Sequence, residues 1–376
     1  MESEALAYLR FPVPLTRGRR YPEKPHRYRN DFQRDRDRIV HARAFRRLED
    51  KTQVFTPELS DHFRNRLTHT IEVSQIARTA AAVLKLDEDL TEALALGHDI
   101  GHPPFGHSGE SELNTQMRRF NDRFDHNLHA LRIVESFEQR YARFPGLNLT
   151  FEVREGIVKH SRDFEPGEDP GLDEYLPGLR PPIEAQLIDL ADEIAYNTAD
   201  LDDAASGGMA DIDELAARAP LFSEIRSSVD TRFPASAARI RFLESLRLLI
   251  DVLVSSLIEG TFQAASDAAV KDVEDVRRYP RRLARLTPDG EQTNAAIKSF
   301  LHDRVYNSGV LLAERARSTS AIAAMFQFFL DQPHRLPLNY QEQAASTPLH
   351  RVVCDYIAGM TNRFFWRTWQ QTRDGQ

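Results

Sequence analysis

Apolar residues recur at helical spacing along most of this chain and predict an all-α protein. From residue 31 onward, apolar positions are three, four or seven residues apart, as on one face of a helix. This spacing predicts helices within residues 31–50, 65–86, 91–96, 111–144, 151–160, 183–203, 212–276, 294–316 and 347–371. No run that alternates apolar and polar residues is longer than a few residues, so we expect no sheet.

Breaks in the pattern predict the irregular segments. Residues 1–30 are rich in Pro, Arg and Tyr and predict an irregular arm, and residues 56–62 predict a polar turn. Residues 163–182 are dense in Pro, Gly and acidic residues. A loop of that length in a compact domain is usually a lid or an oligomer contact.

The composition is that of a globular protein. The chain has 376 residues, of which 41% are hydrophobic and 28% are charged. We expect no segment to approach the roughly 18 apolar residues of a membrane span, and the N-terminus lacks a signal-peptide core, so a cytoplasmic location without membrane contact is expected. The single cysteine, Cys354, excludes an internal disulfide and a cysteine-built zinc site.

Arginine is locally dense in residues 17–20, 27–47 and 277–285. One interpretation is a solvated helix surface with ion pairs. The other is a set of phosphate-binding arms. The net charge of −8 argues weakly against a dedicated nucleic-acid-binding protein.

Residues 93–112 concentrate the candidate chemistry. Three histidines, His98, His102 and His107, lie there with Asp99 and Glu110 among four glycines and a Pro-Pro pair. We expect the glycines and prolines to end the preceding helix, so that His102, His107 and Glu110 project from a constrained loop. One such histidine is usually capped or in a core, but three beside carboxylates indicate metal binding or proton transfer.

Two distant residues are candidates for the same site. His69 is near the start of the helix predicted over residues 65–86, and an antiparallel helical hairpin would bring it level with His98 and Asp99. Asp192, Tyr196 and Asp200 are spaced four residues apart, so they share one face of the helix predicted over residues 183–203. Two histidines and two carboxylates suit Mn, Fe, Ni, Zn or Mg, and spacing does not choose between them.

Several blocks resemble one known family. The order H, HD, D is similar to the HD-domain superfamily of phosphohydrolases. FQRDRDRIVHARAFRRLEDKTQVF, DHFRNRLTHTIEVSQIAR, ALGHDIGHPPFGHSGE, FDHNLHALRIVE, LIDLADEIAYNTADLDD and VVCDYIAGMTNRF resemble the deoxyguanosinetriphosphate triphosphohydrolase family, also called dNTP triphosphohydrolases. These blocks run from Phe32 to Phe364 and so span most of the chain.

The resemblance implies roles for individual residues. It implies that His69, His98, Asp99 and Asp192 hold a divalent metal and that His107 and Glu110 form the catalytic pair, although it does not say whether His107 is the base or the acid. The implied substrate-binding residues are His102 and His126 on phosphate oxygens, Arg66, Lys159 and Lys298 on the triphosphate, and Gln53, Tyr196 and Asp200 around the sugar. Tyr306 is a further implied substrate-binding residue.

The resemblance also implies an organisation and an activity. We expect a basic arm and helix over residues 1–50, an HD-domain helical bundle over 51–205, and a helical region over 206–376 that completes the nucleotide site and the oligomer contacts. The implied reaction converts a dNTP, dGTP included, to a deoxynucleoside and tripolyphosphate. The alternative is an HD-type 5′-nucleotidase or phosphodiesterase.

Cofactor and partners follow the family. Mg or Mn is expected as the metal, with Fe, Ni, Zn or Co as alternatives. A homo-oligomer, tetramer or hexamer, is expected. Some relatives take an allosteric dNTP, for which residues 163–182 and 276–288 are candidates, and some bind single-stranded DNA, for which residues 17–47 are candidates. The base preference is not indicated.

Overall fold

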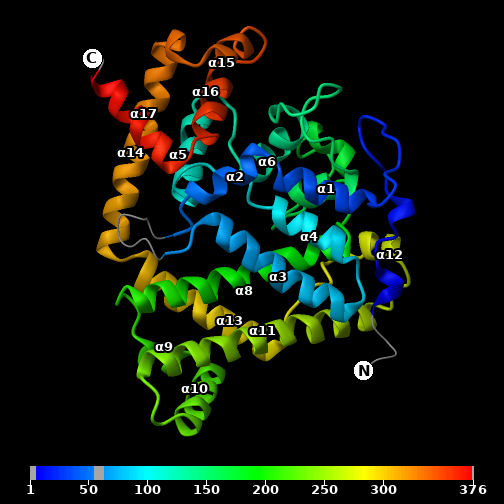
Figure 1. The fold of residues 1–376 in the computed structure, drawn as a ribbon, viewed down its shortest axis with the longest axis vertical. Helices are drawn as coiled ribbons and strands as arrows, with labels where there is room; N and C mark the ends of the chain where they lie inside the picture. Colours follow the sequence, from blue (N-terminus) through cyan, green and yellow to red (C-terminus); the bar gives the residue numbers. More distant parts are fainter. Residues whose placement is uncertain (1–5, 55–62, 375–376) are drawn as a thin grey trace. The chain divides into compact units, whose positions relative to one another are not determined.

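The computed structural model describes residues 6–54 and 63–374, which form helices and connecting loops (Figure 1). Within these residues there is no strand, and β-type pairing is limited to three isolated bridges. The predicted all-α class is therefore confirmed. The polar turn predicted over residues 56–62 lies outside the described residues.

Seventeen α-helices are found in the described residues. In chain order they are α1 (Asp31–Val40), α2 (Arg43–Arg47), α3 (Arg66–Leu84), α4 (Glu88–Gly97), α5 (Gly106–Arg118), α6 (His126–Arg132), α7 (Phe151–Val158), α8 (Ile183–Ser206), α9 (Ile212–Arg218), α10 (Pro220–Arg232), α11 (Ala238–Ala268), α12 (Val273–Arg278), α13 (Pro288–Leu301), α14 (Gly309–Asp331), α15 (Leu338–Gln343), α16 (Leu349–Ala358) and α17 (Asn362–Asp374). Short 3₁₀ or π-helical turns join them: η1 (Ala7–Leu9), η2 (Val13–Leu15), η3 (Leu48–Asp50), η4 (Ile133–Phe137), η5 (Pro170–Tyr175), η6 (His302–Tyr306) and η7 (Pro333–Arg335).

The chain divides into two compact units, each assembled from separated stretches. Unit 1 contains Met1–Asp37, His69–Leu96 and Thr150–Ser308. Unit 2 contains Arg38–Thr68, Gly97–Leu149 and Gly309–Gln376. One boundary falls inside α3, so Arg66 belongs to unit 2 and His69 to unit 1 although one helix carries both.

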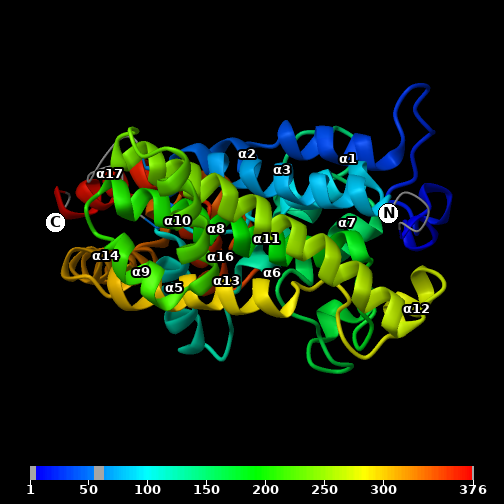
Figure 2. The ribbon, with the colours of Figure 1, turned by 90° about the horizontal axis from the view of Figure 1, so that it is seen from below.

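Unit 1 is built around α8. This helix packs against α11 and α13, and the three lie side by side in both views (Figures 1 and 2). Leu187, Ile194 and Leu201 on α8 are fully buried. The apolar spacing that predicted a helix over residues 183–203 reflects this packing, because the residues between the polar positions fill the core.

The 31-residue α11 contradicts the expectation that no segment is apolar enough to span a membrane. An 18-residue window of α11 has a mean hydropathy of 1.4, and 44% of that window is buried. The helix also packs on α8, α10 and α13 within unit 1. A long core helix passes the same test of length and composition as a membrane span, so the finding is weak evidence for a span.

Unit 2 has its own apolar core. The long helix α14 packs against α5, α16 and α17. The core side chains include Leu113 and Met117 of α5, Phe326 of α14 and Ile357 of α16, all fully buried. Cys354 on α16 is buried in the same cluster and forms no disulfide. Burial, with Asp355 beside it, raises the pKa of this thiol well above its usual value.

The described part of the N-terminal arm, residues 6–30, is irregular apart from the short turns η1 and η2, and buried carboxylates of unit 1 hold it. The backbone N–H of Phe11 donates to Glu184 at 2.8 Å, and the Arg10 guanidinium lies 2.8 Å from Asp87. Arg19 forms an ion pair with the buried Asp35.

Other arginines of residues 17–47 are also ion-paired. Arg34 lies 3.4 Å from Glu23, and Arg36 lies 3.1 Å from Glu92. For these side chains the structure agrees with the interpretation of an ion-paired helix surface.

The acidic loop over residues 163–182 and the basic segment over residues 276–288 are joined to each other in unit 1. Asp163 lies 2.9 Å from Arg180 and 3.0 Å from Arg282. The backbone N–H of Arg180 donates to the carbonyl of Arg277 at 2.8 Å. The opposite charges of the two segments therefore stabilise a local contact, which ties the loop down.

Candidate active site

The turn before α5 sets the direction of the central histidines. Phe105 and Gly106 both have positive φ, 64° and 55°. A Cβ added to Gly106 would lie 2.9 Å from Nη2 of Arg66, so a larger residue would collide with that guanidinium as well as strain the backbone. The chain can therefore reverse within two residues and enter a helix at once.

This turn corrects one sequence expectation. His107 and Glu110 do not lie on a constrained loop, because α5 already begins at Gly106 and both residues are in its first turn. The helix starts early because Phe105, which is not a glycine, takes the left-handed conformation that ends the turn. Three-residue spacing on a helix puts His107 and Glu110 on one face.

In unit 2 a buried carboxylate, Asp99, is surrounded by cations and imidazoles. Arg66 donates from Nη1 to Asp99 Oδ2 at 2.7 Å. Asp99 Oδ1 lies 2.9 Å from His102 Nδ1 and 3.5 Å from His98 Nε2. Burial alone would raise the pKa of Asp99, but Arg66 and the two histidines lower it well below its usual value. Asp99 is therefore an anion over the whole neutral range.

Glu110 connects two histidines of the same unit. Its Oε1 lies 2.7 Å from Nδ1 of His126 and accepts the backbone N–H of His126 at 3.0 Å, while its Oε2 lies 3.3 Å from Nδ1 of His107. Burial alone would raise the pKa of Glu110. The hydrogen bonds to His107 and His126 outweigh that effect, so the pKa lies well below its usual value. The pairing of Glu110 with His107 was expected from sequence. Its closer contact with His126, sixteen residues away, was missed.

His102 completes this cluster. Its ring stacks on that of His126 with centroids 3.9 Å apart, and ligand-type atoms of His102, His107 and Glu110 lie within 4.8 Å of one another. Burial, with Arg66 and His126 nearby, lowers the pKa of His102 well below its usual value. The His102 imidazole is therefore neutral at pH 7, and His107 is the exposed member of the cluster, with 70% of its side chain accessible.

In unit 1 a second imidazole–carboxylate pair is formed by His69 and Asp192. Nε2 of His69 lies 2.7 Å from Oδ1 of Asp192. His160, which the sequence interpretation left unassigned, lies beside them with Nδ1 2.8 Å from Asp189 and Nε2 3.6 Å from Asp192. Burial lowers the pKa of His160, but hydrogen bonds to Asp189 and Asp192 outweigh it and raise the pKa to about 10. The signal available in the sequence was the i, i+3 pair of aspartates on α8.

The polar face of α8 continues toward η6. Asp200 accepts a 2.6 Å hydrogen bond from the hydroxyl of Tyr306, and the rings of Tyr196 and Tyr306 have centroids 5.9 Å apart. Burial and the neighbouring Asp200 raise the pKa of Tyr306. Three predicted substrate-binding residues of unit 1 are therefore adjacent.

The two lysines predicted to bind triphosphate differ in environment. Lys159 is buried, and its ammonium donates to Glu155 at 3.0 Å and to the carbonyls of Leu176 and Leu179 at 2.9 and 2.8 Å. A phosphate bound there would have to replace one of these acceptors. Lys298 is 61% exposed and pairs with Glu193 at 2.8 Å. It lines a cavity of about 390 Å³ between α8 and α13.

Gln53 is the remaining predicted residue. Its Oε1 atom is buried, and among the described residues it has no hydrogen-bond partner. Its backbone carbonyl oxygen lies 3.4 Å from the position that a Cβ on Gly106 would occupy. Gln53 is thus near the turn that precedes His107, in the same unit.

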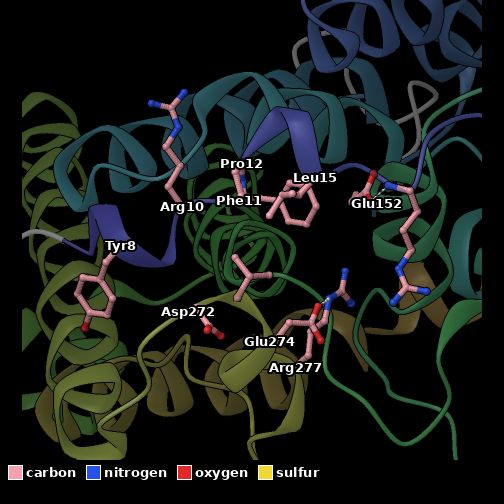
Figure 3. Close-up of a pocket in the computed structure, with 11 residues that line it drawn as sticks. Tyr8, Arg10, Phe11, Pro12, Leu15, Glu152, Asp272, Glu274 and Arg277 are labelled. Carbon is pink, nitrogen blue, oxygen red and sulfur yellow. Dashed lines mark hydrogen bonds and ion pairs between the residues drawn. The ribbon is translucent and has the colours of Figure 1, made fainter.

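A separate cavity of about 220 Å³ lies in unit 1 between the N-terminal arm and α12 (Figure 3). Figure 3 shows arm residues such as Phe11 on one side and Asp272, Glu274 and Arg277 on the other. The lining residues are Tyr8, Arg10, Phe11, Pro12, Leu15, Arg17, Glu152, Asp272, Val273, Glu274 and Arg277. Three acidic and three basic side chains balance, so the charge of this cavity selects neither an anion nor a cation.

The donor chemistry of both units fits a divalent metal. Nε2 of His69 lies 2.7 Å from Oδ1 of Asp192, and Nε2 of His98 lies 3.5 Å from Oδ1 of Asp99. Each pair thus places an imidazole nitrogen beside a carboxylate oxygen, and both are ligand types for divalent metals. The four residues are the set that sequence reasoning selected. The single cysteine, Cys354, is buried in the apolar core of unit 2 and is not one of the proposed ligands. The proposed ligands are therefore histidine and carboxylate only.

Comparison with known proteins identifies the class. The HD-domain family model matches residues 66–197, and the model described as a phosphohydrolase-associated domain matches residues 284–371. The first match includes His69, His98, Asp99 and Asp192, and the second includes Lys298 and Tyr306. The protein is therefore an HD-domain protein with a phosphohydrolase-associated region.

Sequence relatives define the family more narrowly. The chain is 45% identical to a deoxyguanosinetriphosphate triphosphohydrolase-like protein of Azoarcus sp. (strain BH72), covering 93% of this chain and 92% of the relative. Proteins of the same name from Caulobacter sp. (strain K31) and Rickettsia canadensis (strain McKiel) are 43% and 38% identical, covering 93% and 95% of this chain and 91% and 96% of theirs. The chain belongs to the family of deoxyguanosinetriphosphate triphosphohydrolase-like proteins, which confirms the resemblance found in the sequence.

Solved structures also match this chain. One of them is that of a hypothetical protein from Aquifex aeolicus, 17% identical, covering 72% of this chain and 68% of that chain with a TM-score of 0.30. A likeness this low supports no statement about function.

Proposed function

We propose that this protein is a metal-dependent dNTP triphosphohydrolase, which converts a dNTP, dGTP included, to a deoxynucleoside and tripolyphosphate. The names of the relatives and the HD domain support a phosphohydrolase of this type. The observation that carries the proposal is the cluster of His107 and Glu110, in the first turn of α5, with His126 at the start of α6, all in the same unit as Asp99. That cluster is suited to moving a proton beside a phosphate ester.

His69, His98, Asp99 and Asp192 are the proposed ligands of one divalent ion, Mg²⁺ or Mn²⁺. When bound, the ion would supply Lewis-acid activation of phosphorus and of an attacking water. Fe, Ni, Zn and Co remain alternatives.

The protein's own residues would perform the remaining steps. His107, oriented by Glu110, is proposed to exchange a proton with the water or with the departing 5′-oxygen. His102 and His126 would contact phosphate oxygens, and the cations Arg66, Lys159 and Lys298 would offset the charge of the triphosphate. Gln53, Tyr196, Asp200 and Tyr306 are proposed to surround the deoxyribose, where a close tyrosine would exclude a 2′-hydroxyl.

Product analysis tests the proposal. The full-length protein is incubated with each dNTP singly and in mixtures, with Mn²⁺ or Mg²⁺, and the products are separated by ion-exchange chromatography. Release of tripolyphosphate and deoxynucleoside is the expected result. Release of orthophosphate would favour the nucleotidase alternative, and turnover of mixtures but not of single dNTPs would indicate an activating nucleotide. A tetramer or hexamer, single-stranded DNA binding and the cytoplasmic location stay predictions.

A further inference from the structure

His160 lies between two carboxylates of α8 and has no role in the function proposed above. It comes just after Lys159, the C-cap residue of α7, and only 5% of its side chain is exposed. Its Nδ1 is 2.8 Å from Oδ1 of Asp189, and its Nε2 is 3.6 Å from Oδ2 of Asp192. Because Asp189 and Asp192 are three residues apart on one helix, both face the same imidazole.

Asp189 is itself held from two sides. It accepts the backbone N–H of Ser161 at 2.9 Å and forms an ion pair with Arg282. Arg282 in turn lies 3.0 Å from Asp163 and donates to the carbonyl of Lys159 at 2.6 Å. The carboxylate that orients His160 is therefore fixed by the backbone on one side and by the partly buried Arg282 guanidinium on the other, which leaves the imidazole little freedom to turn.

The two oxygens of Asp192 face different partners. Oδ1 is 2.7 Å from Nε2 of His69, and Oδ2 is directed to His160. Because Oδ1 contacts His69 and Oδ2 faces His160, the carboxylate of Asp192 cannot rotate freely about χ2. Its Oδ1 atom therefore stays on the His69 side. Partners of this kind orient metal ligands and affect metal affinity, although they do not touch the metal.

We propose that His160 is a positioning residue, which acts with Asp189 to hold Asp192 as a ligand through Oδ1. This inference rests on the proposed function, because Asp192 must bind a metal for its orientation to matter. It adds a residue pair to the site and assigns that pair an effect on metal affinity rather than on the chemical step.

A Mn²⁺ titration of full-length, chelator-treated protein by calorimetry tests this. His160→Ala and Asp189→Asn should each raise the Kd for Mn²⁺ by about 10- to 100-fold. The double variant should be no weaker than the weaker single variant, because both changes interrupt one chain of contacts. His160→Gln, which can still donate an N–H, should recover part of the affinity. At saturating Mn²⁺, kcat of the variants should return toward the wild-type value.

His129→Ala is the matched control. His129 is also a buried imidazole beside a buried carboxylate, with Nδ1 3.5 Å from Asp355, but it lies in unit 2 and contacts none of the proposed ligands. It should lower the Tm of the metal-free protein about as much as His160→Ala without changing the Kd for Mn²⁺. If His160→Ala does not fold, Asp189→Asn and His160→Gln carry the same test.

Each other outcome is informative. An unchanged Kd in His160→Ala and Asp189→Asn would overturn the positioning role and leave the proposed function intact. Complete loss of binding in His160→Ala, as expected for Asp192→Ala, would make His160 a direct ligand and also overturn it. Failure of the wild-type protein to bind Mn²⁺ or any other divalent ion tested would instead remove the proposed function, and the positioning role with it.

Discussion

At the scale of single residues, His107 and Glu110 differ in exposure. The His107 side chain is 70% accessible, and that of Glu110 is 19% accessible. An exposed imidazole next to a partly buried anion can reach a bound substrate without disturbing the core, so its loss should affect chemistry more than folding.

His107→Ala is therefore expected to reduce kcat by about 10²- to 10⁴-fold. Its Tm and its Kd for Mn²⁺ should stay close to the wild-type values. His302→Ala is the control, because His302 is also exposed, at 69%, and lies 3.4 Å from a neighbouring acid, Asp303. Near-normal turnover in His107→Ala would remove this residue from the mechanism.

Glu184 gives a pH prediction at the same scale. Burial raises the pKa of Glu184 to about 7. The backbone N–H groups of Phe11 and Asp87 favour the anion and lower this pKa, but the effect of burial is larger. The folded state therefore binds a proton that the unfolded state releases above about pH 4.5. The stability contributed by this proton is fully present below pH 4.5 and is lost as the pH rises through about 7.

Glu184→Gln keeps an oxygen for both N–H groups and cannot ionise. Relative to the wild type, the variant should gain on the order of 3 kcal/mol in free energy of unfolding between pH 5 and pH 8. Denaturant unfolding at several pH values measures this. The exposed Glu342→Gln on α15 serves as the control and should leave the pH dependence unchanged. Parallel curves for wild type and Glu184→Gln would contradict the assignment.

At the scale of elements, α5 depends on a close approach to the turn that precedes it. A Cβ at Gly109 would lie 2.0 Å from the carbonyl oxygen of Pro104. Gly109→Ala should therefore lower the free energy of unfolding by about 1–3 kcal/mol and displace His107, with a loss of kcat. Gly309→Ala at the start of α14 meets no atom within 4 Å and should be neutral or slightly stabilising. Equal stability of the two variants would contradict the packing argument.

The sequence predicted elements better than it predicted their ends. The apolar spacing in residues 183–203 located α8, because a helix that fills a core must repeat its apolar residues every three or four positions. It did not locate the start of α5, because a left-handed Phe105 is rare and no local pattern signals it. His160 was missed for a different reason: its neighbours Asp189 and Asp192 come from a helix about thirty residues away. Similarly, the burial of Lys159 depends on carbonyls of a loop that has no pattern of its own.

At the scale of the whole molecule, the proposed ligands are divided between the units. His69 and Asp192 belong to unit 1, and His98 and Asp99 belong to unit 2. These four residues are the proposed ligands of one ion, so binding of that ion should add to the stability of the folded chain.

Mn²⁺ should therefore raise the Tm of the entire chain, by an amount equivalent to about 2.7 kcal/mol at 100 times its Kd. Chelation should reverse the shift, and His69→Ala or His98→Ala should each abolish it. Scanning calorimetry of the metal-free and metal-loaded protein makes the measurement. Stabilisation that survives loss of either histidine would show that the ion binds elsewhere.

The buried sulfur of Cys354 has a practical consequence. The Cys354 thiol is enclosed by side chains of α14 and α16, and its raised pKa keeps it protonated. It should therefore not react with maleimides while the protein is folded. A fluorophore or spin label attached to a newly introduced surface cysteine would then report on that single position without background. The slow rate at which the native protein is modified would, in turn, measure how often this core opens.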